Sequence, residues 1–365
     1  MKFSTKAIHI GHENIKDGDV TVPIHLSTTF AKKKVSDRHQ TGYDYSRTGN
    51  PTRNALEQNL AALDNGTNAY AFASGMAAIT TILLLLKPGD HVVSIDNVYG
   101  GTYRLFTKLF AEKGIEFTFA DFSDANSLKS YIKKNTKLIW LESPTNPSLK
   151  VIDLKSVADF AKTRNILTGI DNTMASPYFQ KPLDLGIDIV MHSLTKYLGG
   201  HSDTIGGSIA VKDTELAKRI QFLQNTTGAI LSPFDSYNVL KGIKTLAVRM
   251  EKHQKNAKKV VEFLSSHKKI KKVYYPGFGG MVSFELQGTF DNAVKFLESL
   301  KLIALAVSFG AVESLIEHPA SMTHATFSKE DREKSGIPDT LIRLSVGIED
   351  VEDIIEDLSR GFTSI

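Results

Sequence analysis

Short β-rich runs that alternate with amphipathic helical stretches constrain the fold more than any other feature of this sequence. The runs begin near Asn68 and are AYAFA (69–73), HVVSID (91–96), IEFTFAD (115–121), KLIWLES (137–143), LTGID (167–171), DIVMHS (188–193) and GSIAV (207–211). Helices are predicted between them, among others at 76–86, 102–113, 124–134 and 154–164. Apolar strands that alternate with helices form βαβ units around a mainly parallel sheet. The sequence therefore predicts an α/β fold.

The regions on either side of this alternation have a different texture. Residues 1–48 contain few periodic elements and many polar residues, which is typical of an arm that docks on a second subunit. From about residue 242 an α+β pattern follows, with helices predicted at 244–266, 290–299 and 349–359 and strands at 281–286 and 341–347. A length of 365 residues fits about two domains. We predict an N-terminal arm (1–48), a main domain (49–241) and a smaller C-terminal domain (242–365).

Composition excludes several classes of protein and site. The chain has no cysteine, which excludes disulfides, thiolate metal sites and a cysteine nucleophile, and we predict no metal site. The net charge is only +4, and we read the basic run 255–272 as a solvated helix face followed by a loop, so nucleic acid is not an expected partner. The longest apolar run, 82–86, is too short to cross a bilayer, and the N-terminus lacks the apolar stretch of a signal peptide. We expect a cytoplasmic protein without a membrane partner.

Two strand ends carry the residues with the most specific chemistry. In open parallel sheets, ligands bind beyond the carboxyl ends of the strands. One strand ends in Ser193-Leu-Thr195-Lys196, where two hydroxyls suit a phosphate and the lysine can form a Schiff base. Another ends in Asp171, one βαβ length earlier in the chain. A carboxylate that faces a pyridinium nitrogen, together with a Schiff-base lysine, is what a protein provides for pyridoxal phosphate. We predict this cofactor on Lys196, with Asp171 at its ring nitrogen.

Each of these residues also has a simpler interpretation. Asp171 alone is more often a helix N-cap, but its combination with Lys196 favours the cofactor. The Ser193-to-Lys196 spacing also matches serine acylases, whose companion Ser-Asp-Asn and Lys-Thr-Gly motifs do not occur here. Gly75 opens a helix whose free N–H groups suit an anion, although a tight turn explains it equally well. Tyr99 can stack on a cofactor ring or move a proton, or it can be a core aromatic beside a turn.

Motifs spread over almost the whole chain resemble those of the Cys/Met-metabolism pyridoxal-phosphate enzymes, which include cystathionine γ-lyase, γ-synthase, β-lyase and methionine γ-lyase. They are YDYSRTGNPTR (43–53), ASGMAA (73–78), VYGGTYR (98–104), ESPTNP (142–147), DNT (171–173), HSLTKYLGGHSD (192–203), SFGAVESL (308–315), HPASMTH (318–324) and LIRLSVGIED (341–350). The resemblance implies fold type I, with a cofactor-binding domain at 49–241.

The resemblance also implies roles for individual residues. Lys196 is expected to carry the cofactor and Asp171 to face its ring nitrogen, while Tyr99 is expected to stack on the ring and to take part in catalysis. The other cofactor contacts implied are a phosphate cradle of Gly75, Met76, Ser193 and Thr195, and a pair that reaches a neighbouring subunit's phosphate, Tyr45 and Arg47. The residues implied for the substrate are Asn146, Ser308 and Arg343 at its carboxylate and Arg104 at its far end. A homotetramer built as a dimer of dimers is expected.

The activity implied is carbon–sulfur cleavage of a sulfur amino acid in trans-sulfuration. Cystathionine is the expected substrate, and γ-elimination would release cysteine, 2-oxobutanoate and ammonia. A cystathionine β-lyase or a cystathionine γ-synthase is the alternative within the family. A binding protein that keeps the cofactor but lacks chemistry is the alternative from another class, against which Lys196, Tyr99 and Arg343 argue because all three are present.

Two departures from the family pattern bear on the expected function. Val307 stands before Ser308 where γ-lyases and γ-synthases usually carry glutamate, and methionine γ-lyases resemble this chain there. Methionine γ-lyases, however, carry cysteine where this chain has Gly101. After VYYPG (273–277) the chain lacks some twenty residues that family members usually contain. We expect a broad specificity for thioethers, with γ-cleavage of cystathionine favoured over β-cleavage.

Overall fold

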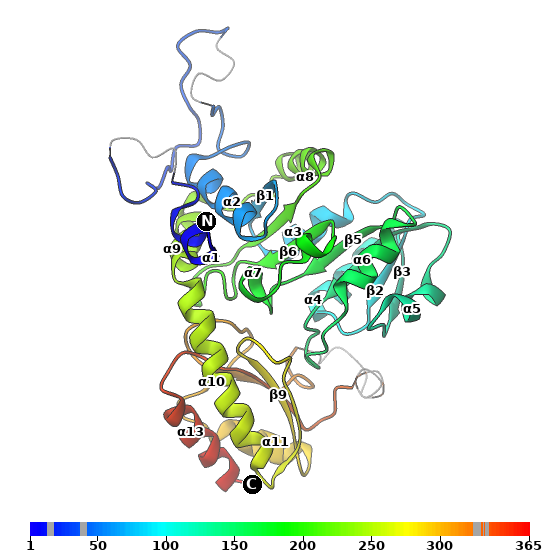
Figure 1. The fold of residues 1–365 in the computed structure, drawn as a ribbon, viewed down its shortest axis with the longest axis vertical. Coiled ribbons are helices and arrows are strands. Elements are labelled where there is room, and N and C mark those ends of the chain that lie inside the picture. Colours follow the sequence, from blue (N-terminus) through cyan, green and yellow to red (C-terminus); the bar gives the residue numbers. More distant parts are fainter. Residues whose placement is uncertain (13–17, 37–41, 324–329, 331, 333–335) are drawn as a thin grey trace.

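Two β-sheets, joined by one long helix, organise the chain. The computed structural model describes residues 1–12, 18–36, 42–323, 330, 332 and 336–365. Figure 1 shows the larger sheet and its flanking helices above the smaller sheet, with helix α10 (Leu246–Ser266) running from one to the other. Among the described residues, no helix combines the length and the apolar character needed to cross a membrane.

The larger sheet has seven strands in the order β1-β7-β6-β5-β4-β2-β3. Strand β7 is antiparallel to both of its neighbours, and the other neighbouring pairs are parallel. The strands are β1 (Asn68–Phe72), β2 (His91–Ile95), β3 (Glu116–Ala120), β4 (Thr136–Glu142), β5 (Leu167–Asp171), β6 (Ile189–Ser193) and β7 (Gly207–Val211). They coincide with the seven predicted runs to within one or two residues, and the predicted α/β fold is confirmed.

Helices connect and flank these strands (Figure 1). They are α1 (Phe3–His9), α2 (Pro51–Leu63), α3 (Gly75–Leu83), α4 (Gly100–Arg104), α5 (Ala125–Leu128), α6 (Leu154–Lys162), α7 (Ser176–Phe179), α8 (Thr214–Thr227) and α9 (Pro233–Lys244). The predicted helix at 102–113 continues from α4 as a π-helical segment, η1 (Leu105–Phe110), and ends in a 3₁₀ turn, η2 (Ala111–Lys113). Further 3₁₀ turns are η3 (Lys129–Tyr131) and η4 (Pro182–Leu185).

The predicted helix at 124–134 is much shorter in the structure. Asp124 caps its start by accepting hydrogen bonds from the backbone N–H groups of Asn126 and Ser127, at 2.9 Å each. The α-helix ends at Leu128 and η3 follows at once. Asn and Ser near the start compete for backbone hydrogen bonds, so the cap forms but propagation is weak.

The smaller sheet has five strands in the order β10-β11-β12-β9-β8. They are β8 (Ile270–Tyr274), β9 (Met281–Leu286), β10 (Ala304–Leu305), β11 (Leu315–Glu317) and β12 (Leu341–Ser345), and helices α10, α11 (Phe290–Glu298) and α13 (Val351–Thr363) accompany them. The basic loop predicted up to residue 272 is wrong, because Lys271 and Lys272 lie in β8. This strand is at the edge of the sheet, where exposed lysines are tolerated and hinder pairing with another chain.

Helix α10 belongs to both hydrophobic cores. Its residues Leu246 and Met250 are buried in the core that also contains the strands of the larger sheet. Ala257, Val260 and Leu264 are buried in the second core, against β9, β12, α11 and α13. Full burial of one leucine stabilises a fold by about 1.5–3 kcal/mol. The helix therefore packs firmly at both ends and fixes the two sheets relative to each other.

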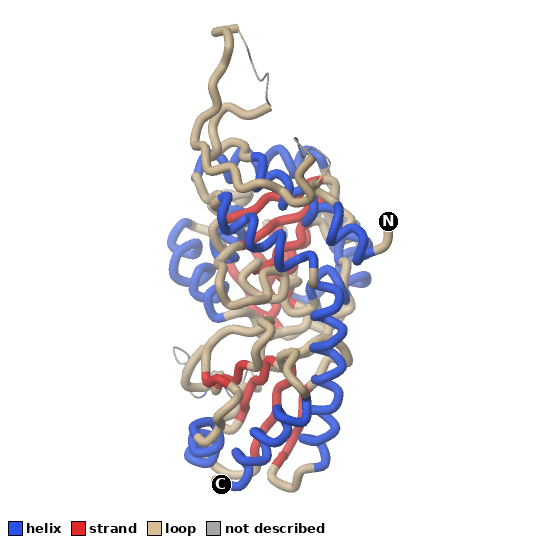
Figure 2. The backbone as a smooth tube through the Cα atoms, turned by 90° about the vertical axis from the view of Figure 1, so that its left-hand side faces the viewer, coloured by secondary structure: helices blue, strands red, loops and turns tan. Residues whose placement is uncertain are grey.

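The segment before α2 extends away from this body. Figures 1 and 2 both show the described part of residues 18–49 projecting from the end of the molecule opposite the C-terminus. An isolated antiparallel β-bridge between Thr29 and Tyr45 connects the outgoing and the returning part of this segment. Residues 13–17 and 37–41 of the predicted arm lie outside the described residues, as does His324 at the end of one family motif.

Candidate active site

The carboxyl ends of β1, β2, β4, β5 and β6 meet at one edge of the larger sheet. A cavity of about 540 Å³ lies there. Residues 307–309 and Arg343 of β12 complete its wall from the side of the smaller sheet. The cavity therefore lies between the two parts of the chain, where the parallel strands predicted a ligand site.

Nearly every residue singled out from the sequence lines this cavity. The lining includes Gly75, Met76, Tyr99, Arg104, Asn146, Asp171, Ser193, Thr195, Lys196, Ser308 and Arg343. Tyr45 and Arg47 do not line it and are exposed, near the start of α2. Glu142, Thr173 and Val307 also line the cavity. The fold thus brings together side chains that are up to 269 residues apart in sequence, from Ser74 to Arg343.

Lys196 follows β6 and points into the cavity. Its Nζ donates a hydrogen bond to Ser308 Oγ at 2.7 Å. Burial, and then the positive charge of Arg343, lower the pKa of Lys196 to about 8. An amine with this pKa is neutral in an appreciable fraction of molecules near pH 7, as a nucleophile or a base must be. Ser308 has φ +129°, a strained value for a residue with a side chain.

Two carboxyl groups lie side by side at the ends of β4 and β5. Glu142 and Asp171 are register partners in the parallel pairing of these strands. Burial raises the pKa of Asp171, against the hydrogen bonds from Thr173 and the electrostatic effects of His192 and Lys196. Burial and the neighbouring Asp171 raise the pKa of Glu142 well above its ordinary value. A protonated ring nitrogen beside Asp171 would supply a positive charge that keeps the Asp171 carboxyl group ionised.

Both carboxyl groups are also oriented by hydrogen bonds. Asp171 Oδ1 accepts from Thr173 N at 3.0 Å and from the Thr173 hydroxyl. Glu142 Oε2 accepts from the backbone N–H of Tyr99 at 2.8 Å. Glu142 therefore holds the start of α4, and with it the backbone of the tyrosine that is half exposed to the cavity.

Arg343 is fixed by three neighbours. Its Nη1 donates to Asn146 Oδ1 at 2.9 Å, and its Nη2 donates to Ser308 O at 3.0 Å. Nη2 also lies 3.2 Å from Glu317 Oε2, in an ion pair whose side chains are 4% and 1% exposed. Glu317 is the register partner of Arg343 in β11. A guanidinium held in one orientation suits a carboxylate, which it binds through two parallel hydrogen bonds.

The start of α3 suits an anion. Ser74 Oγ accepts from Ala77 N at 3.0 Å, and among the residues that the structure describes none accepts a hydrogen bond from the N–H groups of Gly75 and Met76. A Cβ on Gly75 would lie 2.8 Å from Met191 Cε, so a larger residue there would require the end of the Met191 side chain to shift. Free backbone N–H groups at a helix start bind phosphate. With the carboxyl groups and the lysine in the same cavity, the residues present fit pyridoxal phosphate.

Gly101 determines where the Tyr99 ring lies. A Cβ at position 101 would lie 2.3 Å from Tyr99 Cε1 and 3.0 Å from Met76 Sδ. A side chain at this position would therefore displace the ring from its present place. The cysteine that methionine γ-lyases carry at the position of Gly101 would therefore affect Tyr99, the aromatic residue expected to stack on the cofactor.

Glu142, Glu317 and Thr173 are functional candidates that sequence reasoning did not identify. Glu142 and Thr173 lie inside the motifs 142–147 and 171–173, so their position at strand ends was a usable signal. Glu317 had no such signal, because its relation to Arg343 depends on the pairing of β11 with β12.

A lysine of lowered pKa, set beside paired carboxyl groups at the edge of an α/β sheet, is typical of enzymes that carry pyridoxal phosphate on a lysine. Comparison with known proteins agrees with this class. The model of the Cys/Met metabolism PLP-dependent enzymes matches residues 4–363. The chain therefore belongs to this family, as the motifs predicted, and pyridoxal phosphate is its cofactor.

Full-length relatives and solved structures support the same conclusion. The chain is 51% identical to a cystathionine gamma-lyase of Dictyostelium discoideum, covering 99% of this chain and 97% of that protein. It is 50% identical to a cystathionine beta-lyase of Coxiella burnetii, covering 98% and 97%. A cystathionine gamma-lyase structure from Lactobacillus plantarum, complexed with L-serine, has a TM-score of 0.97 at 47% identity and covers 100% and 99%. The predicted carbon–sulfur lyase with an amino-acid substrate is confirmed by these matches.

Proposed function

We propose that this enzyme cleaves the γ-carbon–sulfur bond of cystathionine and releases cysteine, 2-oxobutanoate and ammonia. The observation that carries the proposal is the link through Ser308. Its hydroxyl accepts from Lys196 Nζ, and its carbonyl accepts from Arg343 Nη2. A basic amine and a carboxylate-binding guanidinium are thereby held at a fixed separation, as removal of the α-proton of an amino acid requires.

The residues of this cavity have complementary tasks in that reaction. When bound, pyridoxal phosphate supplies an electron sink for the negative charge at the substrate α-carbon. Arg343 and Asn146 bind the substrate carboxylate and thereby aim the α-hydrogen at Lys196. Lys196 takes that proton, because its lowered pKa leaves an appreciable fraction of the amine neutral, and Ser308 keeps the amine in place. Asp171 would hold the ring nitrogen, and Tyr99 would stack on the ring near the departing sulfur.

The choice between γ- and β-cleavage rests on the far end of the substrate. Relatives with both names match almost equally, at 51% and 50% identity, so overall similarity does not separate them. Val307 is 57% exposed on the cavity wall and offers no charge to a distal amino group. We infer a broad-specificity lyase that favours γ-cleavage; a cystathionine β-lyase or a cystathionine γ-synthase is the alternative.

Identification of the keto acid tests this proposal. The purified enzyme is incubated with cystathionine, and the products are separated by chromatography beside authentic standards. We expect 2-oxobutanoate and cysteine, and neither from a Lys196→Ala control. Pyruvate with homocysteine as the dominant products would make the protein a β-lyase. Synthesis of cystathionine from cysteine and an activated homoserine, without keto acid, would make it a γ-synthase.

We further propose how the chain is divided and assembled. The division is an arm at 1–48, a cofactor-binding domain at 49–241 and a C-terminal domain at 242–365. The assembly is a cytoplasmic homotetramer in which Tyr45 and Arg47 serve the phosphate of a second subunit. Two observations support active sites shared between subunits. The described arm projects from the body, and neither Tyr45 nor Arg47 lines the cavity of its own chain.

A further inference from the structure

The turn formed by residues 45–49, here called the arm turn, is held in one conformation within its own chain. Thr48 N and Gly49 N both donate to Tyr45 O, at 3.0 and 3.1 Å. Tyr45 is 49% exposed, and the Arg47 guanidinium carbon lies 5.7 Å from the centre of its ring. The two side chains proposed to contact a phosphate are therefore exposed on a closed turn.

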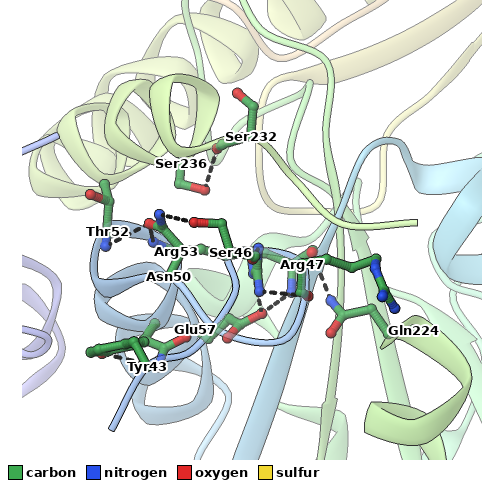
Figure 3. A network of polar contacts seen from close by, with 12 residues as sticks. Tyr43, Ser46, Arg47, Asn50, Thr52, Arg53, Glu57, Gln224, Ser232 and Ser236 are labelled. Atoms are coloured by element: carbon green, nitrogen blue, oxygen red, sulfur yellow. Dashed lines mark hydrogen bonds and ion pairs between the residues drawn. The ribbon is translucent and has the colours of Figure 1, made fainter. Parts of the chain in front are cut away.

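Arg53, in the first turn of α2, holds the backbone of the arm turn by hydrogen bonds to its carbonyl groups. Its side chain is 1% exposed. Nη1 donates to Ser46 O at 2.7 Å, and Nη2 donates to Arg47 O at 3.1 Å. Figure 3 shows this guanidinium beneath the loop that carries Ser46 and Arg47. Two carbonyls on successive residues suit the planar fork of arginine, which the single ammonium of lysine cannot reproduce.

Arg53 is in turn fixed to the larger sheet. Its Nε lies 3.5 Å from Glu57 Oε1, one helical turn further along α2. The same oxygen accepts from Ala71 N, in β1, at 2.9 Å. Asn50 Oδ1 caps the helix by accepting from Thr52 N and Arg53 N, at 3.0 and 3.3 Å. A continuous chain of contacts thus joins β1 to the arm turn (Figure 3).

A second contact holds the Arg47 side chain itself. Arg47 Nη1 donates to Asn225 O at 2.6 Å and to Asn225 Oδ1 at 3.1 Å. The Thr48 hydroxyl donates to the same Oδ1 at 3.2 Å. Asn225 lies in α8, which also packs on β1. The arm turn is therefore held by α2 at its backbone and by α8 at its side chains.

We propose that Arg53 is a positioning residue for cofactor binding, which acts by setting the arm turn so that Arg47 is already oriented when a second subunit docks. This inference rests on the proposed role of Arg47 as a phosphate ligand. Preorganisation matters because ordering a loop and a long side chain at the moment of binding lowers affinity. Arg53 does not line the cavity of its own chain, and we infer that it acts only through Arg47 and its turn.

Cofactor release from the holoenzyme tests this inference. Trp140 is the single tryptophan of the chain and lies in β4, two residues before Glu142 of the cavity, so its fluorescence reports loss of the cofactor. Each holoenzyme is diluted into a reagent that captures the aldehyde of released pyridoxal phosphate, and release is followed over time. The proteins compared are wild type, Arg53→Lys, Arg47→Ala and the double variant. We expect release about tenfold faster for Arg47→Ala and about three- to tenfold faster for Arg53→Lys.

The double variant distinguishes positioning from a general loss of stability. If Arg53 acts through Arg47, the double variant releases the cofactor no faster than Arg47→Ala alone, although its melting temperature falls further. If the double variant instead releases the cofactor faster than Arg47→Ala, by the factor measured for Arg53→Lys alone, the inference is overturned. Unchanged release for Arg47→Ala would instead overturn the proposed phosphate role, whatever Arg53→Lys does. Arg164→Lys is the matched control, because Arg164 also donates to a backbone carbonyl, that of Phe160 in α6, but is itself exposed. Should Arg53→Lys not fold, Arg53→Gln is tested in the same cycle.

Discussion

Position 307 illustrates how one side chain can set the substrate range of a shared site. Val307 lies directly before Ser308, the residue that connects Lys196 with Arg343. An acidic side chain at this position would reach the same cavity and could bind a distal ammonium group through charge-assisted hydrogen bonds. Valine leaves an apolar surface, on which thioethers with and without a distal amino group bind similarly.

Val307→Glu should therefore narrow specificity. We expect the preference for cystathionine over homocysteine in kcat/KM to rise about ten- to a hundredfold, the worth of one charge-assisted hydrogen bond. Steady-state assays with both substrates measure the ratio. Val151→Glu is the control, because Val151 is also exposed but lies outside the cavity. A wild-type enzyme that already prefers cystathionine by several orders of magnitude would show that Val307 is not the determinant.

Sequence reasoning reached the cavity residues that stand at strand ends and missed those defined by pairing across strands. Lys196 and Asp171 could be placed together because parallel strands align their carboxyl ends. Glu317 could not be connected with Arg343, because β11 has only three residues and no alternating pattern announces its register. Tyr45 and Arg47 came from family motifs alone, and their predicted role stays a prediction.

The ion pair between Arg53 and Glu57 in helix α2 makes the free energy of unfolding depend on pH. Burial raises the pKa of Glu57 to about 7, against the charge of Arg53 and the hydrogen bonds from Ala71 N and Gln224. A carboxyl group whose pKa is higher in the folded than in the unfolded protein binds more protons when folded. The free energy of unfolding therefore falls as pH rises from about 4.5 to about 7.

Replacement of Glu57 by glutamine should remove this pH dependence. We expect the stability of Glu57→Gln relative to wild type to increase between pH 5 and pH 8, by on the order of 2 kcal/mol. Urea unfolding of the holoenzyme, followed by circular dichroism at both pH values, measures the difference. Glu215→Gln, on the exposed surface of α8, is the control. An equal difference at pH 5 and pH 8 would mean that Glu57 is already ionised at the lower pH.

Most regular elements were predicted well in both parts of the chain, and the exceptions have local reasons. The seven strands of the larger sheet are short apolar runs between helices, a pattern that local sequence determines. Strand β8 was missed because edge strands tolerate lysine, and its pairing with β9 is a tertiary contact. The π-helical turns of η1 were read as ordinary helix, since both present the same apolar residues to the sheet.

For the assembled protein, the position of Tyr45 and Arg47 outside their own cavity leads to a test by subunit mixing. Lys196→Ala subunits are expected to be inactive, and Arg47→Ala subunits to be inactive at a cofactor concentration too low to load their weakened sites. Random mixing should restore about a quarter of wild-type activity, because half of the dimers are hybrids and each hybrid contains one intact site. Activity is measured after exchange, with differently tagged subunits to show that hybrids form. Absence of activity in purified hybrids would exclude shared sites.

The attachment of the cofactor to Lys196 is the claim on which the account of the active site depends. Borohydride reduction of the yellow holoenzyme makes the bond between cofactor and lysine permanent, and mass spectrometry of the digested protein then identifies the labelled residue. We predict a single labelled peptide that contains Lys196, and no label in Lys196→Ala treated in the same way. A cofactor label on any other lysine of the wild-type chain would contradict the account.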